Sequence, residues 1–119
     1  MGDSGPQQCI FCRIVSGDLP ADIVARSAHS VAFRDLAPQA PVHDLVIPRR
    51  HIENAATIEP DDAAVMADML VTARQVAESE GIMDSGYRLV FNVGRDSFNT
   101  VPHLHLHVIG GRALSWPPG

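Results

Sequence analysis

The fold is decided by the stretch His103-Leu104-His105-Leu106-His107-Val108-Ile109, in which three histidines alternate with aliphatic residues. Successive side chains of a β-strand point to opposite faces, so this pattern predicts a strand over 103–109 with one apolar face on the core. The three imidazoles stand on the other face, with neighbouring ones roughly 6.6 Å apart. Each buried imidazole needs hydrogen-bond partners, and three in register are hard to explain by packing alone. The histidine face is therefore a candidate functional site.

Two kinds of chemistry use such a row of imidazoles. Three histidines can hold one zinc ion that activates a hydroxide. Alternatively, one imidazole attacks phosphorus directly, while its neighbours fix its tautomer and hold the phosphate oxygens. The spacing of the histidines leaves both alternatives open.

Short apolar segments elsewhere in the chain predict the rest of a sheet. The expected strands are 23–26, 30–35, 43–47, 87–93 and 103–109. The first two form a hairpin, Pro48 closes the third, and the last two are central strands of the sheet. Residues 37–41 contain two prolines and are expected to form a loop, since proline cannot donate to a ladder of hydrogen bonds.

Two helices are expected. A short one covers 9–15 and ends near Gly17. The clearest helix runs from about Pro60 to Glu80, because proline suits the first helical position and Gly81 suits the position after the last turn. Its expected buried stripe is Val65, Met66, Met69, Leu70, Ala73, Val76 and Ala77. The predicted fold class is α+β, a five-stranded, mainly antiparallel sheet with one long helix and a short N-terminal helix.

Length and composition limit the classes of protein to consider. A chain of 119 residues with 45% hydrophobic content suits one domain, here 9–119, after a polar tail over 1–8 that is expected to be disordered. The absence of a signal peptide or a membrane-length apolar run predicts a cytoplasmic protein without a membrane partner. A net charge of −5 and a lack of lysine argue against nucleic acid as a partner. They favour a small phosphate ligand held mostly by neutral donors.

Cys9 and Cys12 are the only cysteines, in a C-x₂-C spacing. A stable disulfide is disfavoured in a cytosolic protein, so metal binding or redox chemistry is the better interpretation. A thioredoxin-like redox motif is the weaker of the two, because no βαβ pattern follows.

Taken together, these segments resemble the histidine triad (HIT) family. The stretch 103–109 is similar to the His-x-His-x-His signature that names the family, and further segments are similar to its Hint branch, the purine nucleoside phosphoramidases. Those segments are Phe33-Arg34-Asp35, 37–43, Leu45-Val46-Ile47-Pro48, Gly86-Tyr87-Arg88, Gly110-Gly111-Arg112 and Trp116-Pro117-Pro118-Gly119. The resemblance runs from about Cys9 to the C-terminus. It implies a HIT-like fold and a homodimer in which the C-terminal tail lies near the partner's site.

The resemblance also implies roles for individual residues. His105 is the nucleophile that forms a covalent nucleotidyl-histidine, which water then hydrolyses without a catalytic metal. His107 binds the phosphate, His43 orients His107, and Thr100 donates to the phosphate or the leaving group. The implied site for a purine nucleotide, such as an AMP or GMP derivative, consists of Ile10, Phe11, Ile14, Phe33, Asp35, Leu36, Asn92, Asn99, His105 and His107. Within it, Asp35 takes the ribose hydroxyls and the aliphatic and aromatic side chains form the slot for the purine.

The segment 94–102 departs from the family pattern. Asp96 and Phe98 replace glycine-like positions, and Asn99 stands where glutamine is expected. A carboxylate near a phosphate is unfavourable unless it points away. The alternative is therefore a nucleotide-binding regulatory module with weak or no turnover.

A structural metal site is also implied by the resemblance. Cys9, Cys12, His51 and His103 match residues that bind zinc in some HIT proteins and in the related galactose phosphate uridylyltransferases. A tetrahedral Cys₂His₂ site leaves no coordination position for water. The implied zinc would join the N-terminal helix to the sheet and take no part in catalysis.

Overall fold

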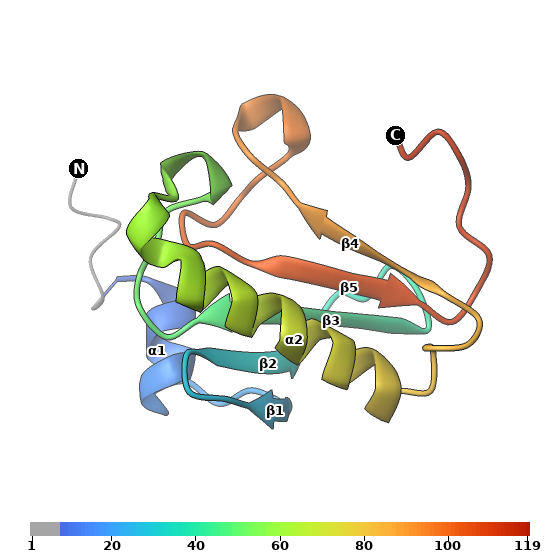
Figure 1. Ribbon diagram of the computed structural model, residues 1–119, viewed down its shortest axis with the longest axis horizontal. Coiled ribbons are helices and arrows are strands. Elements are labelled where there is room, and N and C mark those ends of the chain that lie inside the picture. Colours follow the sequence, from blue (N-terminus) through green and yellow to red (C-terminus); the bar gives the residue numbers. More distant parts are fainter. Residues whose placement is uncertain (1–7) are drawn as a thin grey trace.

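The computed structural model describes residues 8–119 (Figure 1). Its elements in chain order are α1 (Ile10–Ser16), β1 (Ile23–Arg26), β2 (Ser30–Arg34), β3 (Val42–Pro48), η1 (Ala55–Thr57), η2 (Pro60–Asp62), α2 (Ala63–Ser79), β4 (Tyr87–Phe91), η3 (Arg95–Ser97) and β5 (Leu106–Gly110). This architecture confirms the predicted α+β fold, with a five-stranded sheet, one long helix and a short N-terminal helix. The expected tail over 1–8 lies outside the described residues, apart from Gln8.

The strands are all antiparallel to their neighbours, in the order β1-β2-β3-β5-β4. β5 is internal, as predicted, but β4 pairs with β5 alone and forms an edge of the sheet. The prediction that 87–93 is a central strand is therefore wrong. The apolar run that suggested it reflects side chains packed on both faces, since four of the five β4 residues are partly buried and only Leu89 is exposed.

Helix α2 covers one face of the sheet. Met69, Ala73 and Val76 are fully buried against Val46 and Val108. The expected stripe needs one correction: Leu70 is 45% exposed, and Thr72 is buried instead, where its Oγ1 hydroxyl donates to Ser27 Oγ at 3.2 Å. The predicted first turn, from Pro60, is the 3₁₀ turn η2, and α2 itself begins at Ala63. Gly81 follows the helix with a left-handed φ of +78°, a conformation that glycine adopts without strain.

Helix α1 packs on the opposite face of the sheet. Phe11 joins a second apolar cluster with Phe33 of β2 and with Leu45 and Ile47 of β3. These strand residues alternate with Ala32 and Val46, which contact α2, so the two helices lie on different faces. The part of this second face that α1 leaves uncovered carries the histidines.

The strand predicted over 103–109 begins three residues late, at Leu106. The Leu104 amide donates to the carbonyl of Ile52 at 2.6 Å, and the His103 amide donates to Val101. These bonds take the backbone of 103–104 away from the β-ladder. His103 is consequently buried beside α1, away from the remainder of the histidine row.

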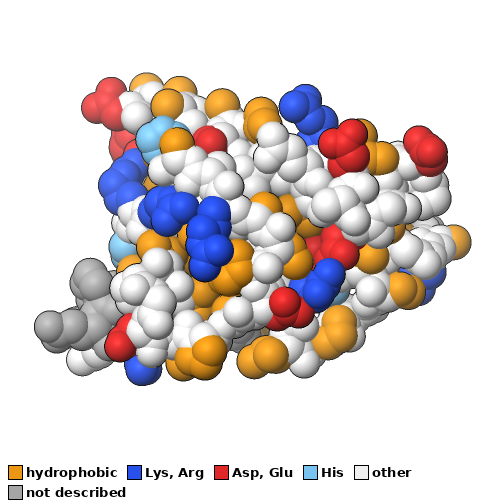
Figure 2. Space-filling view, turned by 90° about the horizontal axis from the view of Figure 1, so that it is seen from below, with side chains coloured by type: hydrophobic (Ala, Val, Ile, Leu, Met, Phe, Trp, Pro, Cys, Tyr) orange, Lys and Arg blue, Asp and Glu red, His pale blue; other side chains and the backbone are white. Residues whose placement is uncertain are grey.

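The edge of the molecule that carries β1 shows a mixed surface. Basic side chains gather toward the left of this view, and side chains of opposite charge lie close together toward the right (Figure 2). None of the helices formed by residues 8–119 combines the length and the apolar character that a membrane span requires.

Candidate active site and metal centre

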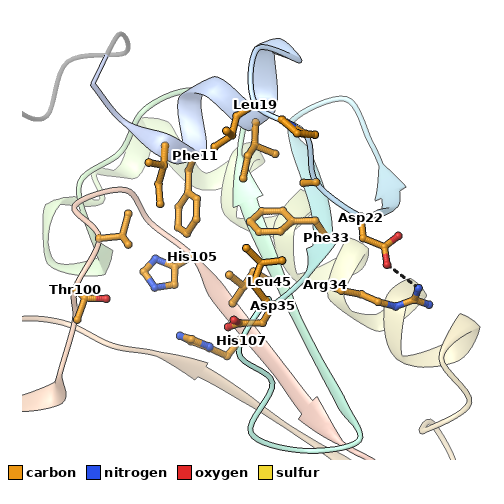
Figure 3. Close-up of a pocket in the computed structure, with 16 residues that line it drawn as sticks. Phe11, Leu19, Asp22, Phe33, Arg34, Asp35, Leu45, Thr100, His105 and His107 are labelled. Carbon is orange, nitrogen blue, oxygen red and sulfur yellow. Dashed lines mark hydrogen bonds and ion pairs between the residues drawn. The ribbon is translucent and has the colours of Figure 1, made fainter.

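A cavity of about 370 Å³ opens between α1 and the sheet. One wall is apolar and consists of Ile10, Phe11 and Ile14 of α1 facing Phe33 of β2. The other end carries the polar groups Asp35, Thr100, His105 and His107. Figure 3 shows Phe11 and Phe33 close to His105, and Asp35 beside His107. An apolar slot that ends in a few convergent polar groups is typical of a site for a small organic ligand.

The His105 ring is held in one orientation and one tautomer. Its Nδ1 lies 2.7 Å from the carbonyl oxygen of His103, so Nδ1 carries the proton and donates it. The edge of the Phe11 ring packs on the imidazole, with 5.2 Å between centroids. Nε2 of His105 is left with a lone pair, which makes it a potential nucleophile toward the cavity that His105 lines.

His107 belongs to a chain of hydrogen bonds. The main-chain amide of Gln39 donates to His43 Nδ1 at 3.0 Å, so the proton of His43 is on Nε2. That Nε2 donates to His107 Nδ1 at 2.9 Å, which leaves the proton of His107 on its own Nε2. The side-chain amide nitrogen Nδ2 of Asn92 lies 3.4 Å from His107 Nε2. We call this chain, Gln39–His43–His107, the histidine relay.

Burial keeps the relay histidines neutral. It lowers the pKa of His107 to about 4, with smaller contributions from the charges of His105 and His43. It also lowers the pKa of His43, against the opposing effect of Asp35. At pH 7 the relay therefore presents a neutral N–H donor at His107 Nε2.

Two thiols, from the N-cap and the first turn of α1, converge with two imidazoles. Cys9 Sγ lies 3.2 Å from His103 Nδ1, Cys12 Sγ lies 3.2 Å from His51 Nδ1, and all four ligand atoms lie within 4.8 Å of one another. A tetrahedral zinc ion, with bonds of about 2.3 Å to sulfur and 2.0 Å to nitrogen, separates such ligands by about 3.5 Å. His103 Nε2 donates to the carbonyl of Pro48, so its Nδ1 has the lone pair that a metal needs. This donor set fits a metal ion.

The surroundings of Cys12 disfavour its thiolate form unless a cation lies beside it. Burial, then the hydrogen bond and charge of Cys9, raise the pKa of Cys12 to about 11. A Cys12 thiolate at this position is therefore stable only beside a positive charge.

A single zinc ion held by all three histidines of the row is not supported by this geometry. His103 directs Nδ1 to the cysteines and Nε2 to Pro48, so neither nitrogen faces His105 or His107. Asp35, His43 and His107 do lie within 4.8 Å of one another, but the two imidazoles are already hydrogen-bonded to each other.

Comparison with known proteins decides the family. The model of the HIT domain matches residues 16–114. The chain belongs to the HIT domain family. It is 45% identical over 113 residues to an uncharacterized HIT-like protein of Synechococcus elongatus, covering 95% of this chain and 98% of that protein.

Solved structures of HIT proteins share the fold. A HIT family hydrolase from Legionella pneumophila is 45% identical, with a TM-score of 0.90 over 93% of this chain and 99% of the other. A hypothetical histidine triad nucleotide-binding protein from Sulfolobus tokodaii is 30% identical, with a TM-score of 0.72 over 85% of this chain and 67% of the other.

Most of the predicted site residues of this HIT domain meet at one cavity. Its lining includes Ile10, Phe11, Ile14, Phe33, Asp35, Leu36, Thr100, His105 and His107. Three predicted residues lie outside that lining. His43 and Asn92 contact His107, and Asn99 is half-buried in the 94–102 segment, with an Oδ1 that has no hydrogen-bond partner among residues 8–119.

Sequence reasoning missed part of the lining. Leu19, Pro20, Ala21, Asp22, Arg34, Leu45 and Val101 also border the cavity. The alternation of β3 was a signal for Leu45, because it lies two residues after His43 and so shares its face. Residues 19–21 carry no motif that indicates a place in the cavity lining.

Proposed function

We propose that this HIT protein hydrolyses nucleoside 5′-phosphoramidates through a covalent nucleotidyl intermediate on His105, as in the Hint branch that it resembles. The observation that carries the proposal is the 2.7 Å hydrogen bond from His105 Nδ1 to the His103 carbonyl. It leaves a lone pair on Nε2 at the end of a cavity of nucleoside size. The Legionella relative is named as a hydrolase and the Sulfolobus relative as a nucleotide-binding protein, and both names support the same class.

A purine nucleotide such as an AMP or GMP derivative suits the cavity. The base would lie between the α1 side chains and Phe33, which offer flat apolar surface. Asp35 Oδ1 accepts from the Ala37 amide, while Oδ2 lies 3.4 Å from His43 Nε2. The carboxylate is thereby held in place with capacity to accept from the ribose hydroxyls.

Two displacements at phosphorus make up the proposed reaction. First, His105 Nε2 forms a bond to phosphorus while the bond to the leaving amine breaks, and the amine departs with the electron pair and takes a proton from solvent. Next, a water oxygen forms a bond to phosphorus and gives up a proton to solvent, while the bond from phosphorus to His105 Nε2 breaks and its electron pair returns to Nε2. The products are the nucleoside 5′-monophosphate and neutral His105. In both steps His107 Nε2–H would donate to a phosphate oxygen, and Thr100 would donate to the phosphate or the leaving group.

We further propose that the Cys₂His₂ cluster, Cys9, Cys12, His51 and His103, holds structural zinc. When bound, the ion would supply a cross-link and no catalytic chemistry, because four protein ligands complete its coordination. Cys9 is the N-cap of α1, so the cross-link would fix the helix that forms one wall of the cavity.

We also propose that the protein is a homodimer. Each copy would have a tail over 1–8 followed by a single HIT domain over 9–119. Leu70 and Val71 of α2 and Leu89 of edge strand β4 are 39–45% exposed, which supports an apolar contact with a second copy. Trp116, which is 81% exposed, would bring the C-terminal tail near the partner's site. Sedimentation equilibrium, compared between the parent protein and Leu89→Glu, tests the dimer.

The second candidate is a nucleotide-binding module with little turnover, and the 94–102 segment favours it. Phe98 takes a left-handed φ of +66°, which glycine adopts at less cost, and is 84% exposed. By contrast, Asp96 pairs with Arg95 at 2.8 Å, and both side chains are largely exposed to solvent. Asp96 therefore does not place an extra carboxylate at the phosphate. Phe98 remains the main difference from the family pattern in this segment.

The deciding experiment is intact-mass spectrometry under an acid-free quench after mixing with adenosine 5′-phosphoramidate. The parent protein should gain one adenylate transiently, and His105→Ala should gain none. His29→Ala, a change at an exposed histidine, is the matched control and should behave as the parent does. Nucleotide binding without adduct or product would favour the binding module.

A further inference from the structure

The end of the cavity away from His105 carries an ion pair. Asp22, which directly precedes β1, and Arg34 of β2 both border the cavity, and Arg34 Nη1 donates to Asp22 Oδ2 at 3.1 Å. Figure 3 shows the two side chains beyond Phe33, on the side away from His105. The contacts proposed above for the phosphate and the ribose use neither side chain. We call Asp22 and Arg34 the rim pair.

The backbone holds the rim pair beside the slot proposed for the base. The Arg34 amide donates to the Asp22 carbonyl at 3.0 Å, and Ile23 pairs with Phe33 at the start of β1. Asp22 therefore lies next to the stretch 33–35, in which Phe33 is assigned to the base and Asp35 to the ribose. These two residues are separated by roughly 7 Å along the chain. A base that leaves its ribose at Asp35 and packs on Phe33 would have its outer edge at the rim pair.

Glu80 fixes the guanidinium of the rim pair in place. Arg34 Nε and Nη2 donate to the two carboxylate oxygens of Glu80 at 3.1 and 3.0 Å. With the bond to Asp22, these contacts use three of the five N–H groups of Arg34, so further donors remain for a ligand. A group that is held in advance loses little freedom when a ligand binds to it.

Asp22 supplies hydrogen-bond acceptors at the same place. Its Oδ2 accepts from Arg34, while its Oδ1 has no donor among residues 8–119. The side chains of Asp22 and Arg34 are 63% and 51% exposed, so their polar ends are accessible to a ligand. The rim pair thus presents guanidinium donors next to carboxylate acceptors.

Guanine and adenine differ at the edge that lies farthest from the ribose. Guanine has the O6 acceptor there, followed by the N1–H and 2-amino donors. Adenine has the 6-amino donor, followed by the N1 acceptor. A guanidinium N–H matches O6, and a carboxylate matches two adjacent N–H donors. Adenine would instead place the N1 lone pair against the carboxylate.

We infer that the rim pair selects guanine over adenine, with Asp22 as the specificity-determining residue. Asp22 would accept from N1–H and the 2-amino group, and Arg34 would donate to O6. The inference rests on the proposed function, which places the nucleoside in this cavity with its ribose at Asp35. The substrate class is then the guanosine 5′-phosphoramidates.

Three 5′-phosphoramidates with the same leaving amine, those of guanosine, adenosine and inosine, test the inference. Calorimetry on the His105→Ala protein gives their Kd values without turnover, and kcat/KM is measured on the parent. The guanosine compound should be preferred over the adenosine compound by about tenfold, toward the lower end for a bidentate base contact, because the rim pair is partly exposed. Inosine keeps O6 and N1–H but lacks the 2-amino group, so its compound should fall between the two.

Variants of Asp22 assign the preference to the rim pair. Asp22→Asn removes the charge and replaces one acceptor by a donor, and Asp22→Ala removes both acceptors. Each should bring the ratio of the guanosine and adenosine compounds toward one, and both leave Arg34 bound to Glu80. Asp18→Asn is the matched control, because Asp18 is an exposed carboxylate that pairs with Arg13 and does not border the cavity. Its ratio should equal that of the parent.

The outcomes separate the two proposals. Equal values for the guanosine and adenosine compounds, or a preference for adenosine, would overturn the guanine inference alone. A guanine preference that persists in both Asp22 variants would also overturn it, as would an inosine compound that binds no better than the adenosine compound. Binding of none of the three compounds would overturn the proposed function, and this inference with it.

Discussion

His105 Nδ1 donates a 2.7 Å hydrogen bond to the main-chain carbonyl of His103, whose own Nδ1 faces the two cysteines. One residue thus belongs to the candidate metal-binding cluster through its side chain and to the candidate active site through its backbone. Phe11 strengthens the link, because its ring packs against both imidazoles, with centroids 5.8 Å from His103 and 5.2 Å from His105. Ordering of the cluster is therefore coupled to the tautomer and position of His105.

Removal of zinc should destabilise the protein without abolishing the chemical step. Free zinc at a hundred times its Kd stabilises the fold by about 2.7 kcal/mol, so a chelator should lower the Tm by roughly 10 °C. At 25 °C, kcat should fall by no more than about tenfold, because the proposed metal would only position His103. Thermal unfolding and single-turnover kinetics, with and without chelator, measure the two effects.

Cys9→Ser/Cys12→Ser is the control for chelation, since its Tm should not respond to a chelator. A parent protein whose Tm is equally insensitive would contradict the structural-zinc proposal. Complete loss of the chemical step, restored by added metal, would instead identify a catalytic ion.

The histidine relay should behave as one unit in a double-mutant cycle. His43→Ala removes the donor that sets the tautomer of His107, so it should lower kcat by about 10- to 100-fold. Adding His107→Ala should cost little beyond the loss from His107→Ala alone, because His43 acts through His107. Two losses that multiply in full would show that His43 contributes independently.

Asp35→Asn should weaken recognition of the ribose. A carboxylate accepts stronger hydrogen bonds from hydroxyls than an amide does, so kcat/KM should fall by about 10- to 100-fold with adenosine 5′-phosphoramidate. The 2′,3′-dideoxy compound lacks those hydroxyls and provides the matched control. Parent and variant should differ little on it, and an equal loss on both compounds would assign Asp35 to the relay instead of the ribose.

The sequence predicted the elements of this fold better than their packing. Alternation located all five strands, and Gly17 and Gly81 marked the two helix ends. The start of β5 was missed, because alternation continues through His103 while its backbone bonds to Val101 and Leu104 bonds to Ile52. Ile52 is distant in the sequence, and the bond to Val101 is not part of a β-ladder. No local sequence pattern predicts either bond.

The candidate site was predictable where a motif carried it. The residues gathered around the cavity between α1 and the sheet were predicted largely from family resemblance, and α1 brings Phe11 to His105 only through tertiary packing.

The final prediction concerns Asp44, a buried acid on the α2 face of the sheet, and its half-buried neighbour Glu80. Asp44 of β3 is 1% exposed, and its Oδ2 has no hydrogen-bond donor among residues 8–119. Burial, then the hydrogen bond and charge of Glu80, raise the pKa of Asp44 to about 7, against the opposing effect of Arg34. Arg34, which binds both Glu80 carboxylate oxygens, lowers the pKa of Glu80. Asp44 is therefore the member of the pair that holds a proton up to about pH 7.

Asp44→Asn should stabilise the protein at high pH and not at low pH. Because the folded-state pKa is raised from 3.8 to about 7, the stability that protonated Asp44 contributes is complete below pH 4 and is lost as pH rises to 7. Asparagine cannot ionise, so the variant should exceed the parent by on the order of 2–4 kcal/mol at pH 8 and match it near pH 4. Urea unfolding at both pH values measures this, with the exposed Asp84→Asn as control. Equal stability of parent and Asp44→Asn at pH 8 would mean that Asp44 is ionised at no cost, with Arg34 as its partner.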